Sequence, residues 1–191
     1  EMKRAGYDVI IIEGKAEEPT YLYIKNGEVK FRAADKIWGL CTTDAQQVIK
    51  DELHDQNVRI SCIGPAGEKL SFMAAIVNER RVAGRKGLGA VMGSKNLKAI
   101  ALRGDQQLEI ADKEKYDTAR KRMREGMQKS PILYPEFSRY GTSTTLDLTQ
   151  ALGIYPALNW AGTGVFTPAD KIGGFAIEAL SAGKTACAGC P

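Results

Sequence analysis

Residues 80–95 combine residue types that could bind an anion. The segment holds the basic residues Arg80, Arg81, Arg85, Lys86 and Lys95, with four glycines among them. Glycines let the backbone turn without side-chain clashes, so that N–H groups can point at one anion, and arginines add charge-assisted hydrogen bonds. The composition of this segment therefore predicts a site for a phosphate or a similar anion.

The order of the residues does not match the common nucleotide loops. A P-loop ends in Gly-Lys followed by Ser or Thr, whereas this segment ends in Gly93-Ser94-Lys95. A dinucleotide loop leads into a helix, whereas residues 96–102 alternate in polarity and predict a strand that continues directly from the loop. Two alternatives therefore stay open: a nucleotide-binding module that uses the Gly87–Gly93 loop, and glycines that only pack a tight connection.

A Cys-x-x-Cys pair, Cys187 and Cys190, is the second feature that could do chemistry. This spacing is typical of zinc knuckles, thioredoxin-like redox sites and iron–sulfur clusters. Zinc would need a second pair of ligands, and a thioredoxin-like site would lie between a strand and a helix early in the chain. Cys41 and Cys62 stand alone, and we expect both to be buried, inert thiols.

The bulk composition excludes several classes of partner. The chain has 191 residues, 43% of them hydrophobic and 26% charged, with a net charge of +4. Basic residues alternate with acidic ones except at residues 80–86, so the charge favours a local anion site over a nucleic-acid surface. No apolar run is long enough to span a membrane, and the opening residues EMKRAGYD lack the charged-then-apolar pattern of an export signal. We expect a cytoplasmic protein that binds neither nucleic acid nor membrane.

The elements that must position these residues fall into two halves. A hairpin is predicted around Asn26-Gly27, the strongest short signal for one, and a helix is predicted from Thr43 to about residue 53. Strands are predicted at 7–13, 20–25, 28–32, 58–63, 70–77 and 97–102, with a turn at 64–67; helices are predicted at 112–128, 142–152 and 176–180. The pattern predicts an α+β fold whose β-rich domain covers residues 1–108 and whose helical domain covers residues 109–191.

Five stretches, taken in order, resemble the aldehyde ferredoxin oxidoreductase family. They are GYDVIIIEGK at 6–15, IGPAGE at 63–68, AGRKGLGAVMGSKNLKAI at 83–100, YGT at 140–142 and CAGCP at 187–191. Members of this family carry tungsten or molybdenum on two pyranopterins, whose phosphates share a magnesium ion, beside a 4Fe-4S cluster. The resemblance implies an internal fragment: part of a pterin-binding β-rich domain, then the start of a truncated, cluster-binding helical domain.

The resemblance also implies roles for individual residues. Arg81 or Arg85 would neutralise the pterin phosphates, and a main-chain carbonyl near Val82 or Ala83 would face the magnesium. The residues expected against the cofactor are Arg81, Val82, Ala83, Gly84, Arg85 and Gly87. Cys187 and Cys190 would be the first two cluster ligands, with the others beyond residue 191. Lys95 and Lys98 would either touch the cofactor or lie in solvent.

The activity implied by the resemblance is oxidation of a small aldehyde to a carboxylic acid with water. Two electrons would pass through the cluster to ferredoxin or to an iron–sulfur electron-transfer subunit, and a homo-oligomer is compatible with this family. Other members act on an aromatic acyl-CoA or a hydroxy acid, and the sequence leaves these substrates open. The catalytic residues are expected outside this chain, so we expect the chain alone to be inactive.

Overall fold

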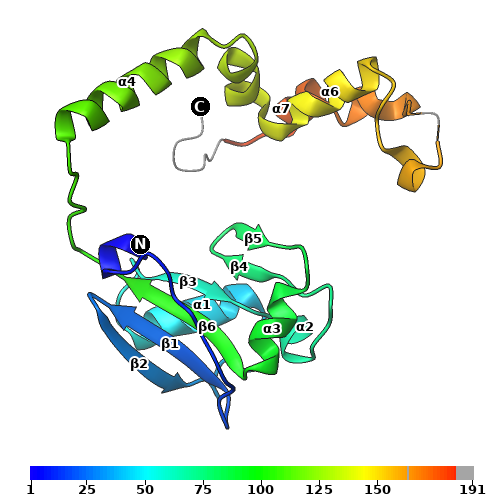
Figure 1. Cartoon of the computed structure of the whole chain (residues 1–191). Helices are drawn as coiled ribbons and strands as arrows, with labels where there is room; N and C mark the ends of the chain where they lie inside the picture. Colours follow the sequence, from blue (N-terminus) through cyan, green and yellow to red (C-terminus); the bar gives the residue numbers. More distant parts are fainter. Residues whose placement is uncertain (163, 184–191) are drawn as a thin grey trace. The chain divides into compact units, whose positions relative to one another are not determined.

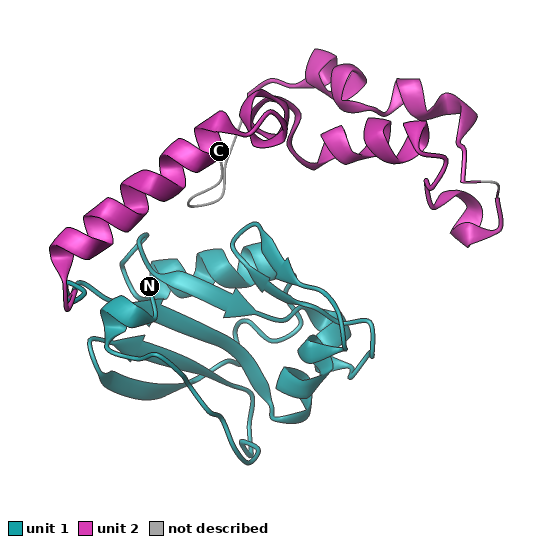
Figure 2. Cartoon of the chain, turned by 45° about the horizontal axis from the view of Figure 1, so that its top comes forward, with its two compact units in different colours: residues 1–109 teal, residues 110–191 magenta. Residues whose placement is uncertain are grey.

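The computed structural model describes residues 1–162 and 164–183 and divides the chain into two compact units. The first unit is Glu1–Glu109 and the second is Ile110–Pro191, drawn in separate colours in Figure 2. The first unit is built on a β-sheet with helices, and the described part of the second is helical. The α+β fold class predicted from the sequence is therefore confirmed.

The first unit contains one six-stranded mixed sheet with the order β2-β1-β6-β3-β4-β5 (Figure 1). Neighbouring strands are antiparallel except β1 and β6, which run parallel. The strands are β1 (Thr20–Lys25), β2 (Glu28–Ala33), β3 (Arg59–Cys62), β4 (Ile76–Asn78), β5 (Arg81–Ala83) and β6 (Leu97–Arg103). The β4–β5 hairpin forms one edge of the sheet, and β5 is the edge strand.

The predicted hairpin and the predicted first helix are confirmed. Asn26 and Gly27 both have positive φ angles, 48° and 90°, as the tight turn between β1 and β2 requires. Helix α1 (Thr42–Glu52) begins one residue before the predicted start. Its N-cap is Cys41, and no side chain makes a capping hydrogen bond there.

The hydrophobic core lies on both faces of the sheet. The larger cluster joins Ala45 and Ile49 of α1 to strand residues such as Tyr21, Ile60 and Ala99. The smaller cluster joins Leu22 of β1 to Met92 of α3 (Leu88–Ser94). Because successive side chains of a strand point to opposite faces, Tyr21 and Leu22 place α1 and α3 on opposite sides of the sheet.

Two predicted strands are wrong or too long. Residues 7–13 form no strand, and Val9 and Ile11 are 68% and 80% exposed. No strand of the described sheet pairs with this segment. Its backbone therefore makes no inter-strand hydrogen bonds, and its apolar side chains are not buried as part of the sheet. In the apolar run at 70–77, only the residues that belong to β4 form a strand. The earlier part of the run forms a turn, in which the Ala74 N–H donates to the Ser71 carbonyl.

Two short helices replace a predicted turn and a predicted direct connection. Residues 64–67 were expected as a turn, but α2 (Pro65–Glu68) is one helical turn with proline in its first position. The glycine-rich loop was expected to run straight into a strand, but α3 stands between the loop and β6. Three glycines in and beside α3 hide the apolar period that would have predicted this helix.

The described part of the second unit is a series of helices, with α4 (Lys113–Lys129) first and longest. The others are η2 (Ile132–Phe137), α5 (Ser138–Tyr140), η3 (Gly141–Ser143), α6 (Thr144–Ala151), η4 (Ala157–Trp160), η5 (Thr167–Lys171) and α7 (Gly174–Leu180). The rings of Tyr140 and Phe175 pack with centroids 5.1 Å apart, and the Arg139 Nε donates to Glu178 at 2.8 Å. The three predicted helices correspond to α4, α6 and α7.

No helix within residues 1–162 and 164–183 is both long enough and apolar enough to cross a membrane.

Candidate functional site

The β4–β5 hairpin carries the basic residues and is fixed at its turn. Glu79, with a φ of 52°, donates its backbone N–H to the Gln46 side chain at 3.1 Å. Its carboxylate accepts from Lys50 Nζ at 3.1 Å. Gln46 and Lys50 both belong to α1, so the turn of the hairpin is tied to the main helix of the unit. This anchor could not be predicted from the sequence, because nothing in the spacing links residues 46 and 79.

Residues 80–86, from the turn through β5 into the loop, are all exposed. Arg80, Arg81, Arg85 and Lys86 form no ion pair or hydrogen bond through their side chains with any residue that the structure describes. Four uncompensated positive charges on seven consecutive residues give this surface a local positive potential. The side chains are therefore free to bind an anion.

The backbone of the same segment offers oxygen ligands. β5 is an edge strand, so one side of it presents N–H and C=O groups that the sheet does not pair. Magnesium prefers such hard oxygen ligands, and phosphate prefers arginine and backbone N–H donors. The donor set of residues 81–86 therefore fits a group that carries phosphates and a divalent cation, which is the group that the family resemblance implies here.

The glycines have two different uses. Gly87 has a φ of 67°, and a Cβ built on it would lie 2.8 Å from the Phe72 carbonyl oxygen. Cβ atoms at Gly89 and Gly93 would lie 2.7 Å and 1.9 Å from the carbonyl oxygens of Ala75 and Gly67. These glycines thus face the protein interior and let α3 pack closely. A Cβ at Gly84 would meet only Val82 Cγ1, at 3.4 Å, so Gly84 belongs to the exposed part of the loop.

The two lysines near the end of the loop lie in different environments. Lys95 Nζ donates to the Gly14 carbonyl at 2.9 Å, at an exposed position. Lys98 is fully buried, with its ammonium between the Leu40 carbonyl, at 2.9 Å, and the Glu68 carboxylate. Neither role proposed for Lys98, cofactor contact or a solvated position, is therefore correct.

The cysteines within the described residues are not equivalent. Cys62 is buried, with its Sγ 3.6 Å from the Thr42 carbonyl oxygen, and burial raises its pKa to about 11. Cys41 is exposed, so the expectation that both thiols are buried is wrong for Cys41. It occupies the N-cap position of α1, and its Sγ donates to an Asp44 carboxylate oxygen at 3.1 Å. Cys187 and Cys190 lie outside the described residues.

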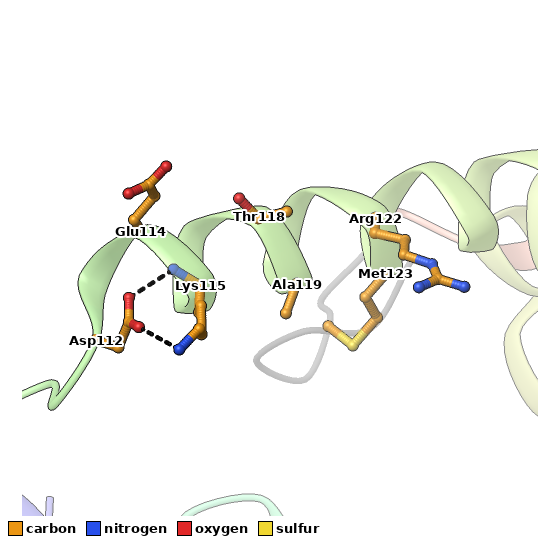
Figure 3. A pocket seen from close by; sticks show the side chains of 7 residues that line it. All are labelled: Asp112, Glu114, Lys115, Thr118, Ala119, Arg122 and Met123. Carbon is orange, nitrogen blue, oxygen red and sulfur yellow. Dashed lines mark hydrogen bonds and ion pairs between the residues drawn. The ribbon is translucent and has the colours of Figure 1, made fainter.

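A hollow of about 740 Å³ runs along the first half of α4 (Figure 3). The seven residues that line it all come from this helix or its N-cap: Asp112, Glu114, Lys115, Thr118, Ala119, Arg122 and Met123. Asp112 accepts from the backbone and the side-chain nitrogen of Lys115, both at 2.9 Å. The hollow contains none of the predicted site residues. Across the described ranges, no group of three or more His, Cys, Asp or Glu side chains could hold a metal ion.

An α+β unit with an exposed basic loop on its edge hairpin, followed by a helical unit, is the arrangement that the resemblance to an oxidoreductase family implies. The family model for the aldehyde ferredoxin oxidoreductase N-terminal domain matches residues 1–104. The model for domains 2 and 3 of the same family matches residues 118–191. The chain therefore belongs to the aldehyde ferredoxin oxidoreductase family.

Proteins with three different names are similar to this chain. A tungsten-containing aldehyde ferredoxin oxidoreductase from Pyrococcus abyssi is 44% identical over the whole chain, which spans 32% of that relative's length. The WOR-like subunit of an aliphatic sulfonate oxidoreductase from Pyrococcus furiosus is 41% identical over 60% of the chain and 21% of the relative. A solved structure, the active-site complex of benzoyl coenzyme A reductase with 1,5-dienoyl-CoA, is also similar, with a TM-score of 0.69 and 34% sequence identity. The match covers 78% of this chain and 25% of the chain in that structure.

Proposed function

We propose that the chain is part of a tungsten (or molybdenum) oxidoreductase and that its basic loop binds the phosphates of the pyranopterin cofactor. The observation that carries this proposal is the exposed, unpaired set of cations on residues 80–86, at an edge strand with free backbone groups. Membership of the family and the tungsten named in its Pyrococcus relatives support it.

Within the loop, the guanidinium groups of Arg81 and Arg85 bind phosphate oxygens. The carbonyls of Val82 and Ala83 are offered to magnesium, and Gly84 keeps the approach to the backbone open. Gly87 contributes indirectly, because its positive φ ends the loop and starts α3. These residues hold and orient the cofactor. They supply neither the acid nor the base of the reaction, whose groups we place outside this chain.

For the whole protein we propose oxidation of an aldehyde. Aldehyde and water give a carboxylic acid, two protons and two electrons, and the bound metal–pterin group supplies the acceptor for those electrons. Cys187 and Cys190 are proposed as two of the four thiolates of a 4Fe-4S cluster, through which electrons reach ferredoxin or an iron–sulfur subunit. We place this protein in the cytoplasm and expect it to form a homo-oligomer.

The substrate is the least constrained part of the proposal. Relatives named for aldehydes, for aliphatic sulfonates and for benzoyl coenzyme A all match this chain. An aromatic acyl-CoA is therefore one alternative substrate class. A hydroxy acid is the other alternative, and it rests on the family resemblance alone. A segment shared by relatives with such different names is better suited to holding the cofactor than to choosing the substrate.

A nucleotide-binding module is the alternative from a different class, and the packing does not favour it. The glycines at 87, 89 and 93, which such a module would use, lie against carbonyl oxygens of the protein itself. A phosphate placed there would meet acceptors instead of donors. The free cations lie on residues 80–86, before these glycines.

Metal analysis separates the two classes. A polypeptide of the relatives' full length that carries this sequence should be purified without oxygen from cells supplied with tungstate and molybdate. We expect stoichiometric tungsten or molybdenum and about four irons per chain. Tight binding of adenine nucleotides with neither metal present would support the nucleotide-binding module and refute the proposal.

A further inference from the structure

The IGPAGE stretch, residues 63–68, has no part in the phosphate loop, and the structure ties it at both ends to Lys98. At its start, the Ile63 N–H donates to the Lys98 carbonyl oxygen at 3.0 Å. At its end, the Glu68 carboxylate pairs with the Lys98 ammonium. One residue of β6 thus fixes the first and the last residue of the segment that contains α2.

The Glu68–Lys98 ion pair is almost completely buried, with side-chain exposures of 5% and 0%. Three further hydrogen bonds complete it. The Gly39 N–H donates to both Glu68 oxygens, at 3.0 and 2.9 Å, and Lys98 Nζ donates to the Leu40 carbonyl at 2.9 Å. A buried charge is tolerated only when it is paired and hydrogen-bonded, so neither partner can move away alone without a large cost. The pair therefore holds α2 against β6 and residues 39–40.

Helix α3 packs directly on α2, with almost no space between the two backbones. A Cβ on Gly67 would lie 2.9 Å from the Gly89 carbonyl oxygen, and one on Gly93 would lie 1.9 Å from the Gly67 carbonyl oxygen. Gly67 is the neighbour of Glu68, and α3 begins at its N-cap Gly87. Any shift of α2 must therefore shift α3 and with it the end of the loop at residues 81–86.

We infer that Glu68 and Lys98 are a positioning pair for the basic loop: they fix α2, α2 carries α3, and α3 sets where the loop ends. Only one part of this inference rests on the proposed function, namely that the ligand of the loop is the cofactor. Glu68 and Lys98 do not contact the cofactor, because both are enclosed by the protein. Their effect on cofactor binding runs through the backbone of α2 and α3.

Amide hydrogen exchange on the 191-residue chain tests the positioning without any cofactor. The Gly89 N–H donates to the Ala74 carbonyl at 3.0 Å, so its exchange rate reports on how firmly α3 is packed against the rest of the unit. The amides of α1 report on the stability of the rest of the unit. In Lys98→Met we expect the Gly89 amide to exchange about tenfold faster relative to α1, because α2 and α3 open locally. The matched control is Ile49→Val, in the core cluster that includes α1, which should not raise that ratio.

Glu68→Gln serves as the milder variant where Lys98→Met does not fold. Its side chain keeps an oxygen for the Gly39 N–H and for Lys98, so the same amide should accelerate by a smaller factor. Equal acceleration at Gly89 and α1, or no acceleration in either variant, would overturn the inference. In the full-length protein, both variants should also lower tungsten content at equal amounts of folded protein. If amide exchange changes and tungsten content does not, the positioning role of Glu68 and Lys98 stands. The proposal that the loop binds the cofactor phosphates is then contradicted.

Discussion

Gly87 lies so close to Phe72 that a Cβ atom at position 87 would be 2.8 Å from the Phe72 carbonyl oxygen. The φ of Gly87, 67°, is also one that side-chain-bearing residues rarely adopt. We therefore expect Gly87→Ala to lower the free energy of unfolding by about 1–3 kcal/mol, through the clash and the backbone strain together. Urea unfolding of the 191-residue chain measures this loss.

Gly84→Ala is the control for this prediction. Its Cβ would meet only Val82 Cγ1 at 3.4 Å, and the free energy of unfolding should change by less than about 0.5 kcal/mol. Equal losses at positions 84 and 87 would show that the contact with Phe72 does not restrict residue 87.

The two described cysteines should differ in reactivity. Burial raises the pKa of Cys62 to about 11, so at pH 8 almost none of this thiol is in the reactive thiolate form. Cys41 is exposed at the start of α1. Iodoacetamide labelling of the native chain, mapped by peptide mass spectrometry, should modify Cys41 well before Cys62. Comparable labelling of the two in the folded chain, with labelling in urea as the reference, would count against the burial of Cys62.

Asp55 should contribute to stability in a defined pH range. The Asn57 N–H donates to its carboxylate at 2.8 Å and lowers its pKa; partial burial opposes this shift, and Arg103 Nε, at 2.9 Å, adds to it. A lowered folded-state pKa means that the stabilisation is complete above the unfolded pKa of about 3.9 and is lost as the pH falls through the folded value. Asp55→Asn should therefore cost stability at pH 7 and progressively less below about pH 4.

Urea unfolding at a series of pH values follows this difference between the variant and the parent chain. Asp35→Asn, at an exposed carboxylate that makes no ion pair or hydrogen bond with the described residues, is the matched control and should leave the pH dependence unchanged. A constant difference between the Asp55→Asn variant and the parent chain from pH 7 to pH 3 would mean that the carboxylate is not stabilised by these donors.

Local signals predicted those parts of the fold that depend on neighbours in the sequence. The hairpin at Asn26-Gly27 and the helix over residues 45–53 are each determined by residues within the segment itself, and both predictions are confirmed. The run at 7–13 has the composition of a strand but no partner among the described strands, so Ile11 stays exposed. Strand composition reports the preference of a segment, whereas pairing depends on what else the sheet contains.

The candidate site was predictable in composition but not in geometry. The cluster of arginines indicated an anion site, and the structure leaves Arg81 and Arg85 exposed and unpaired. The glycines looked like part of the same loop, yet their role depends on Phe72 and Gly67, which lie 15 and 26 residues away from Gly87 and Gly93. The burial of Lys98 depends in the same way on Glu68, and nothing in the sequence joins the two.

The double variant Arg81→Ala/Arg85→Ala tests the central claim, that residues 81–86 bind the cofactor phosphates. In the 191-residue chain these side chains have no partner among the described residues, so the melting temperature should stay the same. The control Arg120→Ala/Arg124→Ala removes the same charge from α4.

Tungsten or molybdenum per folded full-length protein is the deciding measurement. Each charge-assisted hydrogen bond to a phosphate contributes about 1.5–3 kcal/mol, so losing two should lower cofactor affinity by about a hundredfold or more. We predict that metal content falls sharply in Arg81→Ala/Arg85→Ala and is unchanged in the α4 control. Full metal content in both double variants would contradict this prediction.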